Sequence, residues 1–269
     1  MFLTEFDQKQ LLVLYPGRFQ LPHLGHKAVF DYLLKTFKSP NTFVVTSDKV
    51  TLPKSPFNFA EKKSLLQLAG IPNDKVVEDP QPYQAKSLVD KFDAANTILL
   101  FAVSEKDMAE DPRFSFAPRK SDGKPSFMQP FKSLDQCKSV SNGIAYIVTT
   151  PTFQFNVLGK PVQSASEIRS MFINGNDKVR KQIFTDLYGK FDPKAFALIS
   201  SKLSSIVESV RCLKESLVQG WGNLRDDQIR NEISKLMDEM KQYALDGNSA
   251  AVAEYVRKLQ PFLQAANHQ

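Results

Sequence analysis

The fold is decided by residues 11–37, which read LLVLYPGRFQLPHLGHKAVFDYLLKTF. Residues 11–15 are continuously apolar, which predicts a strand buried on both faces of a parallel sheet. Residues 26–37 place their apolar side chains on one face of a helix. The turn between these two elements, residues 15–26, therefore lies at the carboxyl end of a strand. Ligands bind at such ends in open parallel sheets.

The alternation of strands and helices continues to about residue 150. We predict four further strands at 42–46, 75–78, 97–103 and 144–149, and two further helices at 60–69 and 85–95. Residues 104–142 are polar, and we expect them to form a long loop or lid. This order predicts an α/β fold with a Rossmann-like, doubly wound, five-stranded parallel sheet.

The pattern changes near residue 190, after which we find no strand. Three helices are predicted at 194–218, 225–245 and 249–266. We therefore predict a Rossmann-like domain over 1–190 and a helical C-terminal domain over 191–269. The apolar stripes of the three helices can bury one another in a small bundle. Alternatively, one face stays exposed and mediates homo-oligomerisation or docking to a partner.

Charge and composition narrow the class of ligand. Residues 192–269 hold ten basic and ten acidic residues, so residues 1–191 carry the whole net charge of +6, which suits a phosphorylated ligand. Nucleic acid is not expected, because no Lys/Arg run has interleaved aromatic residues. No apolar run approaches the ~20 residues that span a bilayer, and the N-terminus does not resemble a secretory signal. Only two cysteines are present, Cys137 and Cys212, and we expect a cytoplasmic protein with reduced thiols.

The turn at residues 15–26 carries the chemistry. His23 and His26 lie three residues apart at the predicted start of a helix. Imidazoles at a helix N-terminus can donate hydrogen bonds to a phosphate whose negative charge grows in a transition state. Gly17 and Gly25 permit a close approach of the backbone. The alternative is that the two histidines only cap the loop.

Three segments of the chain resemble a known family. GRFQLPHLGH (17–26) resembles the GRFxPxHxGH signature of the nucleotidyltransferase superfamily, which includes nicotinamide mononucleotide adenylyltransferases and cytidylyltransferases. SPFNFAEKK (55–63) resembles the NPFxxxER segment of the nicotinamide mononucleotide enzymes. QSASEIR (163–169) resembles the second signature, ISSTxxR or ISGTxIR, although Gln163, Ala165 and Ser166 depart from it. The resemblance covers about residues 10–188 and extends to nucleotidyltransferases of bacteriophages.

The resemblance implies different roles for the site residues. His23, His26 and Arg169 would be catalytic, with the two histidines on the α- and β-phosphates and Arg169 on the distal phosphates. The nucleotide would be bound by Gly17, Arg18, Phe19, Gly25, Ser164 and Ser166. Lys49 and Lys54 are the candidate contacts to a phosphorylated small-molecule acceptor. Mg²⁺ would accompany the nucleoside triphosphate, with no dedicated protein ligands.

The implied reaction transfers a nucleotidyl group to the acceptor and releases pyrophosphate. Nicotinamide-nucleotide adenylyl transfer, from ATP to nicotinamide mononucleotide, is the first hypothesis. A cytidylyltransferase acting on a phosphorylated alcohol or sugar is the second. The third is a non-catalytic protein of the same fold with a structural or virion-associated role. If a phage encodes the chain, the expected location is the cytoplasm of its host. A tRNA synthetase is not expected, because the chain has no KMSKS-like segment.

Overall fold

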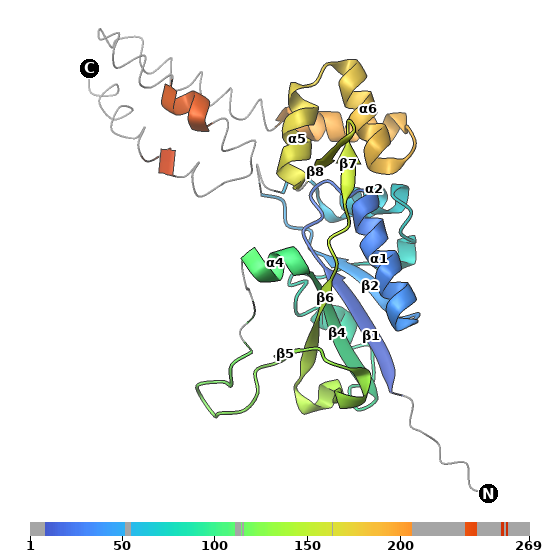
Figure 1. The fold of residues 1–269 in the computed structure, drawn as a ribbon, viewed down its shortest axis with the longest axis vertical. Coiled ribbons are helices and arrows are strands. Elements are labelled where there is room, and N and C mark those ends of the chain that lie inside the picture. The colour runs from blue at the N-terminus through green and yellow to red at the C-terminus, as the bar shows by residue number, and fades with distance from the viewer. Residues whose placement is uncertain are drawn as a thin grey trace, which may run out of the picture. The chain divides into compact units, whose positions relative to one another are not determined.

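A computed structural model gives the fold (Figure 1). It describes residues 9–51, 55–110, 114, 116–162, 164–205, 235–240, 254, 255 and 257. The chain divides into two compact units, and each is described by itself. The first unit consists of Met1–Lys49 and Asn58–Phe155, and the second unit consists of Val50–Phe57 and Asn156–Gln269.

The first unit contains a six-stranded sheet. Its strands are β1 (Gln10–Pro16), β2 (Thr42–Thr46), β3 (Val76–Glu78), β4 (Thr97–Ser104), β5 (Met128–Pro130) and β6 (Ala145–Thr150). The spatial order is β3-β2-β1-β4-β6-β5, and every neighbouring pair is parallel. The chain builds outward from β1 to β2 and β3, and then returns to place β4 on the other side of β1. The order of the strands therefore reverses between β1 and β4, where ligands bind in doubly wound sheets.

The helices of this unit lie between the strands along the chain. They are α1 (Leu24–Phe37), α2 (Phe59–Leu68), α3 (Lys86–Val89) and α4 (Glu105–Glu110), with short 3₁₀ turns η1 (Asn73–Lys75), η2 (Leu134–Gln136) and η3 (Val140–Asn142). Helix α1 lies against β1 and β2 (Figure 1). The predicted α/β fold, with a Rossmann-like parallel sheet and C-terminal helices, is confirmed.

Three elements of the first unit differ from the sequence prediction, and one of them, helix α4, lies in the segment 104–142 that we expected to be a loop. The sheet has six strands instead of five, because β5 lies in the segment that we expected to be a loop. This edge strand has only three residues and includes Pro130, so it carries no strand-like pattern. Helix α3 has four residues instead of the predicted 85–95. Its continuation is replaced by a turn, in which the Asp93 carboxylate accepts hydrogen bonds from the Ala95 N–H and the Asn96 side chain.

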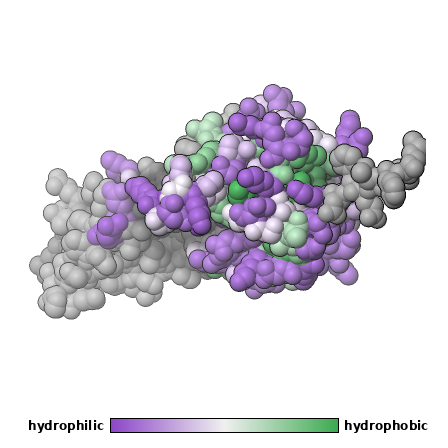
Figure 2. Space-filling model, turned by 90° about the horizontal axis from the view of Figure 1, so that it is seen from below, coloured by the Kyte–Doolittle hydropathy of each residue, from purple (hydrophilic) through white to green (hydrophobic). Residues whose placement is uncertain are grey.

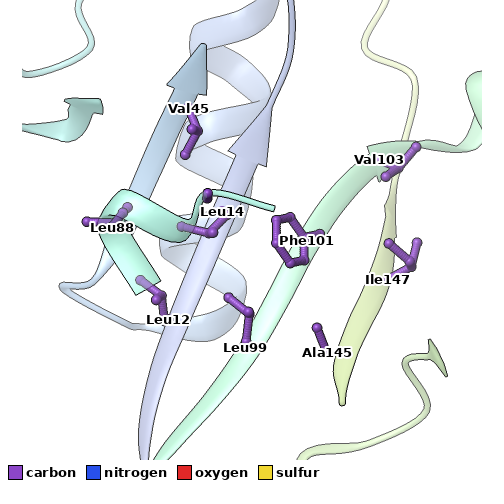
Figure 3. Packing of buried hydrophobic residues seen from close by; sticks show 10 residues of the cluster. Leu12, Leu14, Val45, Leu88, Leu99, Phe101, Val103, Ala145 and Ile147 are labelled. Atoms are coloured by element: carbon purple, nitrogen blue, oxygen red, sulfur yellow. The ribbon is translucent and has the colours of Figure 1, made fainter. Parts of the chain in front are cut away.

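The continuously apolar strands are buried on both faces, as predicted. Leu12 and Leu14 of β1 pack in one core cluster with Phe101 of β4 and Ile147 of β6 (Figure 3). Val13, between them in the sequence, packs in a second cluster on the other face. Because neighbouring side chains of a strand point to opposite faces, both faces of the sheet need a cover of helices.

The second unit is built around two helices, α5 (Ala165–Asn174) and α6 (Asp177–Tyr188). Strands β7 (Phe155–Val157) and β8 (Lys160–Val162) precede them and form a two-stranded sheet. A further helix covers residues 193–205, and its Phe196 ring contacts the rings of Phe172 and Phe184. This helix therefore belongs to the core of the second unit. The domain boundary near residue 190 stays a prediction.

Most of the predicted tail lies outside the described residues. Besides residues 193–205, residues 235–240 are helical, as are 254, 255 and 257, and the rest of the three predicted helices falls outside. No helix in the described part of the chain is long and apolar enough to cross a membrane. Hydrophilic side chains cover most of the coloured surface on the face that Figure 2 shows.

Candidate functional site

The candidate site is the loop that joins β1 to α1. Its first residue, Gly17, extends the sheet, because its N–H donates to the Val45 carbonyl at 3.0 Å. Phe19 and Leu21 then adopt positive φ angles of 46° and 80°. Such conformations cost of the order of 1–3 kcal/mol each in residues other than glycine. Burial of both side chains, which are 4% and 0% exposed, offsets this cost and holds the loop in one shape.

The two histidines cap helix α1 reciprocally. His23 is the N-cap residue, and its Nδ1 accepts a hydrogen bond from the Gly25 N–H at 3.0 Å. The Nδ1 atom of His26 accepts a hydrogen bond from the His23 N–H at 3.1 Å. A backbone N–H can donate only to an unprotonated ring nitrogen. The proton of each neutral imidazole is therefore on Nε2, where it is a hydrogen-bond donor.

The surroundings of the two rings keep them neutral. The ring centroids lie 4.0 Å apart, and the His23 ring stacks on Phe155 at 4.7 Å with an interplanar angle of 17°. The His26 ring meets the edge of Phe19 at 5.1 Å. Burial lowers the pKa of His26 to about 4. Burial, together with the neighbouring His26, holds the pKa of His23 well below its usual value. At neutral pH the site thus has two adjacent uncharged Nε2–H donors.

Glycine is needed at position 25 because of His23. A Cβ atom there would lie 2.7 Å from Cε1 and 2.8 Å from Nδ1 of the His23 ring. A Cβ atom at Gly17 would similarly lie 2.9 Å from the Phe19 ring. We expected these glycines to let the backbone approach a ligand. The structure gives a further reason, because these glycines leave room for the side chains that shape the loop, and their approach to a ligand stays a prediction.

Arg18 and Phe19 are placed differently from each other. Arg18 is exposed on the loop. The Phe19 ring is buried with Phe30, Val44 and Leu66. Any contact of Phe19 with a nucleotide would therefore come from its backbone.

The second signature forms the start of α5 in the second unit. Ser164 is the N-cap residue, and its hydroxyl accepts a hydrogen bond from the Glu167 N–H at 3.2 Å. Arg169 is 5% exposed, and its Nη2 donates to the Ser166 hydroxyl oxygen at 3.1 Å. An open pocket of about 480 Å³ lies here, lined by Ser164, Ser166, Glu167, Ser170 and Met171. Arg169 thus supports a pocket wall through Ser166.

The remaining predicted site residues are less informative. Lys49 is exposed, shortly after β2. Lys54 and Gln163 lie outside the described residues. Because the histidine pair and Arg169 belong to different units, each signature is described separately, and their joint action stays a prediction. No group of three or more His, Cys, Asp or Glu side chains within the described ranges could hold a metal ion.

One charged residue of the segment 55–63, which resembles NPFxxxER, was given no role from the sequence. Lys62 of α2 is 1% exposed, and its Nζ donates to the Thr46 hydroxyl at 3.0 Å and to the Ser47 carbonyl. A signal was present, because Leu65 and Leu66 follow Lys62 by three and four residues and share its helical face. A lysine on the apolar face of a predicted helix indicates a buried partner.

Comparisons with known proteins agree with the motif resemblance. Residues 14–123 match the family model described as cytidylyltransferase-like. A comparison with curated proteins gives no match.

Several solved structures are similar to the chain. A bifunctional NMN adenylyltransferase/ADP ribose pyrophosphatase from Francisella tularensis matches at 16% identity and a TM-score of 0.43, over 78% of this chain and 56% of that one. The chain thus spans little more than half of that protein. A Plasmodium falciparum nicotinic acid mononucleotide adenylyltransferase complexed with NaAD matches at 14% identity and a TM-score of 0.41, over 71% of this chain and 95% of that one.

Proposed function

We propose that this chain, whose residues 14–123 match the cytidylyltransferase-like family of nucleotidyltransferases, transfers a nucleotidyl group from a nucleoside triphosphate to a phosphorylated small molecule. The observation that carries the proposal is the histidine pair. Two neutral imidazoles stand at a helix N-terminus, beside the point where the strand order reverses, and both have the proton on Nε2. Such donors suit an oxygen atom that gains negative charge during a reaction.

The chemistry needs no side-chain nucleophile. An oxygen of the acceptor phosphate attacks the α-phosphorus, a new P–O bond forms, and the bond from the α-phosphorus to the bridging oxygen breaks as pyrophosphate leaves. The protein has to align two anions and balance their charge. His23 and His26 donate from Nε2 to the α- and β-phosphates, while Nδ1 of each ring stays fixed by a backbone N–H.

The second signature is proposed to hold the distal phosphates. Its pocket offers the hydroxyl groups of Ser164, Ser166 and Ser170 at the start of α5. The Ser166 oxygen accepts from Arg169, so its own proton remains for a phosphate oxygen. Glu167 lines the same pocket and would repel a bare triphosphate. Mg²⁺ carried by the triphosphate would supply the charge neutralisation beside Glu167.

Adenylyl transfer from ATP to nicotinamide mononucleotide is the specific reaction that we propose. The resemblance of residues 55–63 to the NPFxxxER segment supports this acceptor. The acceptor would lie on the β2 side of the histidine loop, where Lys49 follows the strand.

The test is a substrate panel with the full chain and Mg²⁺. ATP or CTP is combined with nicotinamide mononucleotide, a phosphorylated alcohol or a sugar phosphate, and pyrophosphate release is measured. We expect release with ATP and nicotinamide mononucleotide, and His26→Ala should lower it by about 10²-fold or more. His268→Ala is the matched control, because His268 lies outside both signatures and should not affect the rate.

Each other outcome of the panel has a defined meaning. If pyrophosphate is released with CTP and not with ATP, the proposed reaction is cytidylyl transfer and not adenylyl transfer. Pyrophosphate release from none of the pairs would leave a non-catalytic member of the family. An unchanged rate in folded His26→Ala would refute the assigned role of the histidine pair.

A further inference from the structure

A buried lysine lies under the carboxyl end of β2. Lys62 reaches from α2 to the last residue of β2, Thr46, and to the first residue after it, Ser47. Burial lowers the pKa of Lys62, whereas the carboxylates of Asp48 and Glu78 act to raise it. A buried amine is costly unless its hydrogen bonds are made, so this position calls for a specific explanation.

The strand end that Lys62 holds is tied to its neighbours on both sides. On one side the Gly17 N–H, at the start of the histidine loop, donates to the Val45 carbonyl at 3.0 Å. On the other side the Asp79 N–H donates to the Thr46 carbonyl at 3.0 Å. These bonds continue the sheet ladder beyond the regular strands. Lys62 therefore braces the middle of three consecutive strand ends.

The segment after β2 is held from a second direction. The Asp48 carboxylate accepts a hydrogen bond from the Phe59 N–H at 2.6 Å, at the first residue of α2. Ser47 and Asp48 are thus both attached to α2, one through Lys62 and one through Phe59. Lys49 is the next residue and is exposed. Its backbone continues directly from the segment that α2 holds at two points.

We propose that Lys62 is a positioning residue, which fixes residues Ser47–Lys49 so that this segment can meet the phosphorylated acceptor. It does not touch the substrate, because its amine is enclosed by Thr46 and Ser47. The kinetic part of this inference rests on the proposed function. The structural part, that Lys62 holds the segment, does not.

The kinetic experiment compares Lys62→Met with Lys63→Met in the full chain. Methionine has a similar length to lysine but cannot donate. Lys63 is adjacent on α2, and its Nζ lies 5.6 Å from the centre of the Phe59 ring. We expect Lys62→Met to raise KM for nicotinamide mononucleotide about tenfold, the range for losing a hydrogen bond to a charged group. The KM for ATP and kcat should change less than about threefold, and Lys63→Met should match the unaltered chain.

A second measurement does not depend on activity. Hydrogen exchange in the full chain should become about tenfold faster at the Phe59 and Asp79 amides in Lys62→Met, because these donate to the Asp48 carboxylate and the Thr46 carbonyl, with β4 amides unchanged. Unaltered exchange at these residues would overturn the inference. If exchange rises but acceptor KM stays constant, the segment does not position the acceptor, and the inference also fails. Absence of any turnover in the unaltered chain would refute the proposed function, and the exchange result would still decide the structural part.

Discussion

Substitution of Gly25 by alanine tests whether the position of the His23 ring matters. The φ angle of Gly25 is not among the positive ones, so its backbone conformation suits alanine. The added Cβ would lie 2.7 Å from Cε1 and 2.8 Å from Nδ1 of His23. Contacts below 3.0 Å force a displacement. The ring also stacks on Phe155, so His23 has to leave its position and lose its bond to the Gly25 N–H.

The size of both effects follows from that displacement. Loss of a helix N-cap bond costs about 1 kcal/mol, which lowers Tm by about 2–4 °C in a protein of this size. Loss of one preorganised donor to a developing charge lowers turnover by about 10²-fold. The stability loss alone leaves nearly all of the protein folded, because domains have about 5–15 kcal/mol of stability. A fall in rate therefore reports on geometry.

The assay pairs pyrophosphate release with thermal unfolding. Asn176→Ala is the matched control, because it removes the N-cap bond of α6 to the Val179 N–H, at 3.0 Å, outside both signatures. We expect a similar fall in Tm for the two variants and a loss of turnover only in Gly25→Ala. Full activity in Gly25→Ala, with the predicted fall in Tm, would show that the His23 ring is not used in the reaction.

Three other predictions test different parts of the molecule. Stability should fall as pH drops from about 6.5 towards 4, because the unfolded chain binds protons that native His26, with its pKa of about 4, does not. Denaturant titrations should show this slope, and His26→Gln should reduce it. Arg169→Lys should raise KM for the nucleoside triphosphate about tenfold, because lysine lacks the planar fork that holds Ser166, and an unchanged KM would exclude the role in phosphate binding. A chain that ends at Asp192 loses the Phe196 contacts and should unfold at a lower temperature than one that ends at Ser205. If light scattering gives the chain ending at Ser205 the same oligomeric state as the full chain, the remaining tail is not an assembly element.

The sheet could be predicted because its strands are strongly apolar. β4 is buried along seven of its eight residues, and an apolar run of this length between turn residues favours a strand that is covered on both faces. β5 could not be predicted, since three residues that include Pro130 form a strand only where a neighbour supplies the hydrogen bonds. The end of α3 at Val89 could not be predicted for a similar reason. It depends on the side-chain bonds of Asp93, which compete with a helix that the apolar spacing favours.

The candidate site was predictable in composition but not in detail. The spacing of His23 and His26 placed them at the start of a helix, as the structure has them. The spacing could not reveal which ring nitrogen carries the proton, because this depends on the backbone amides of Gly25 and His23, which donate to Nδ1. The need for glycine at position 25 to make room for His23 could not be predicted for the same reason, since the group that needs the space is a neighbouring side chain.

The reciprocal histidine cap affects how the motif can be used as a marker. Each ring has one nitrogen that holds the helix and one that remains for chemistry. Selection for folding alone would therefore preserve both histidines after the reaction had been lost. An intact pair in a divergent relative therefore shows that this loop shape and its two Nε2–H donors are kept, and turnover itself has to be measured. Whether such a protein still binds its ligand has to be tested at residues that do not support the loop. Arg18, which is exposed on the same turn, is one such residue.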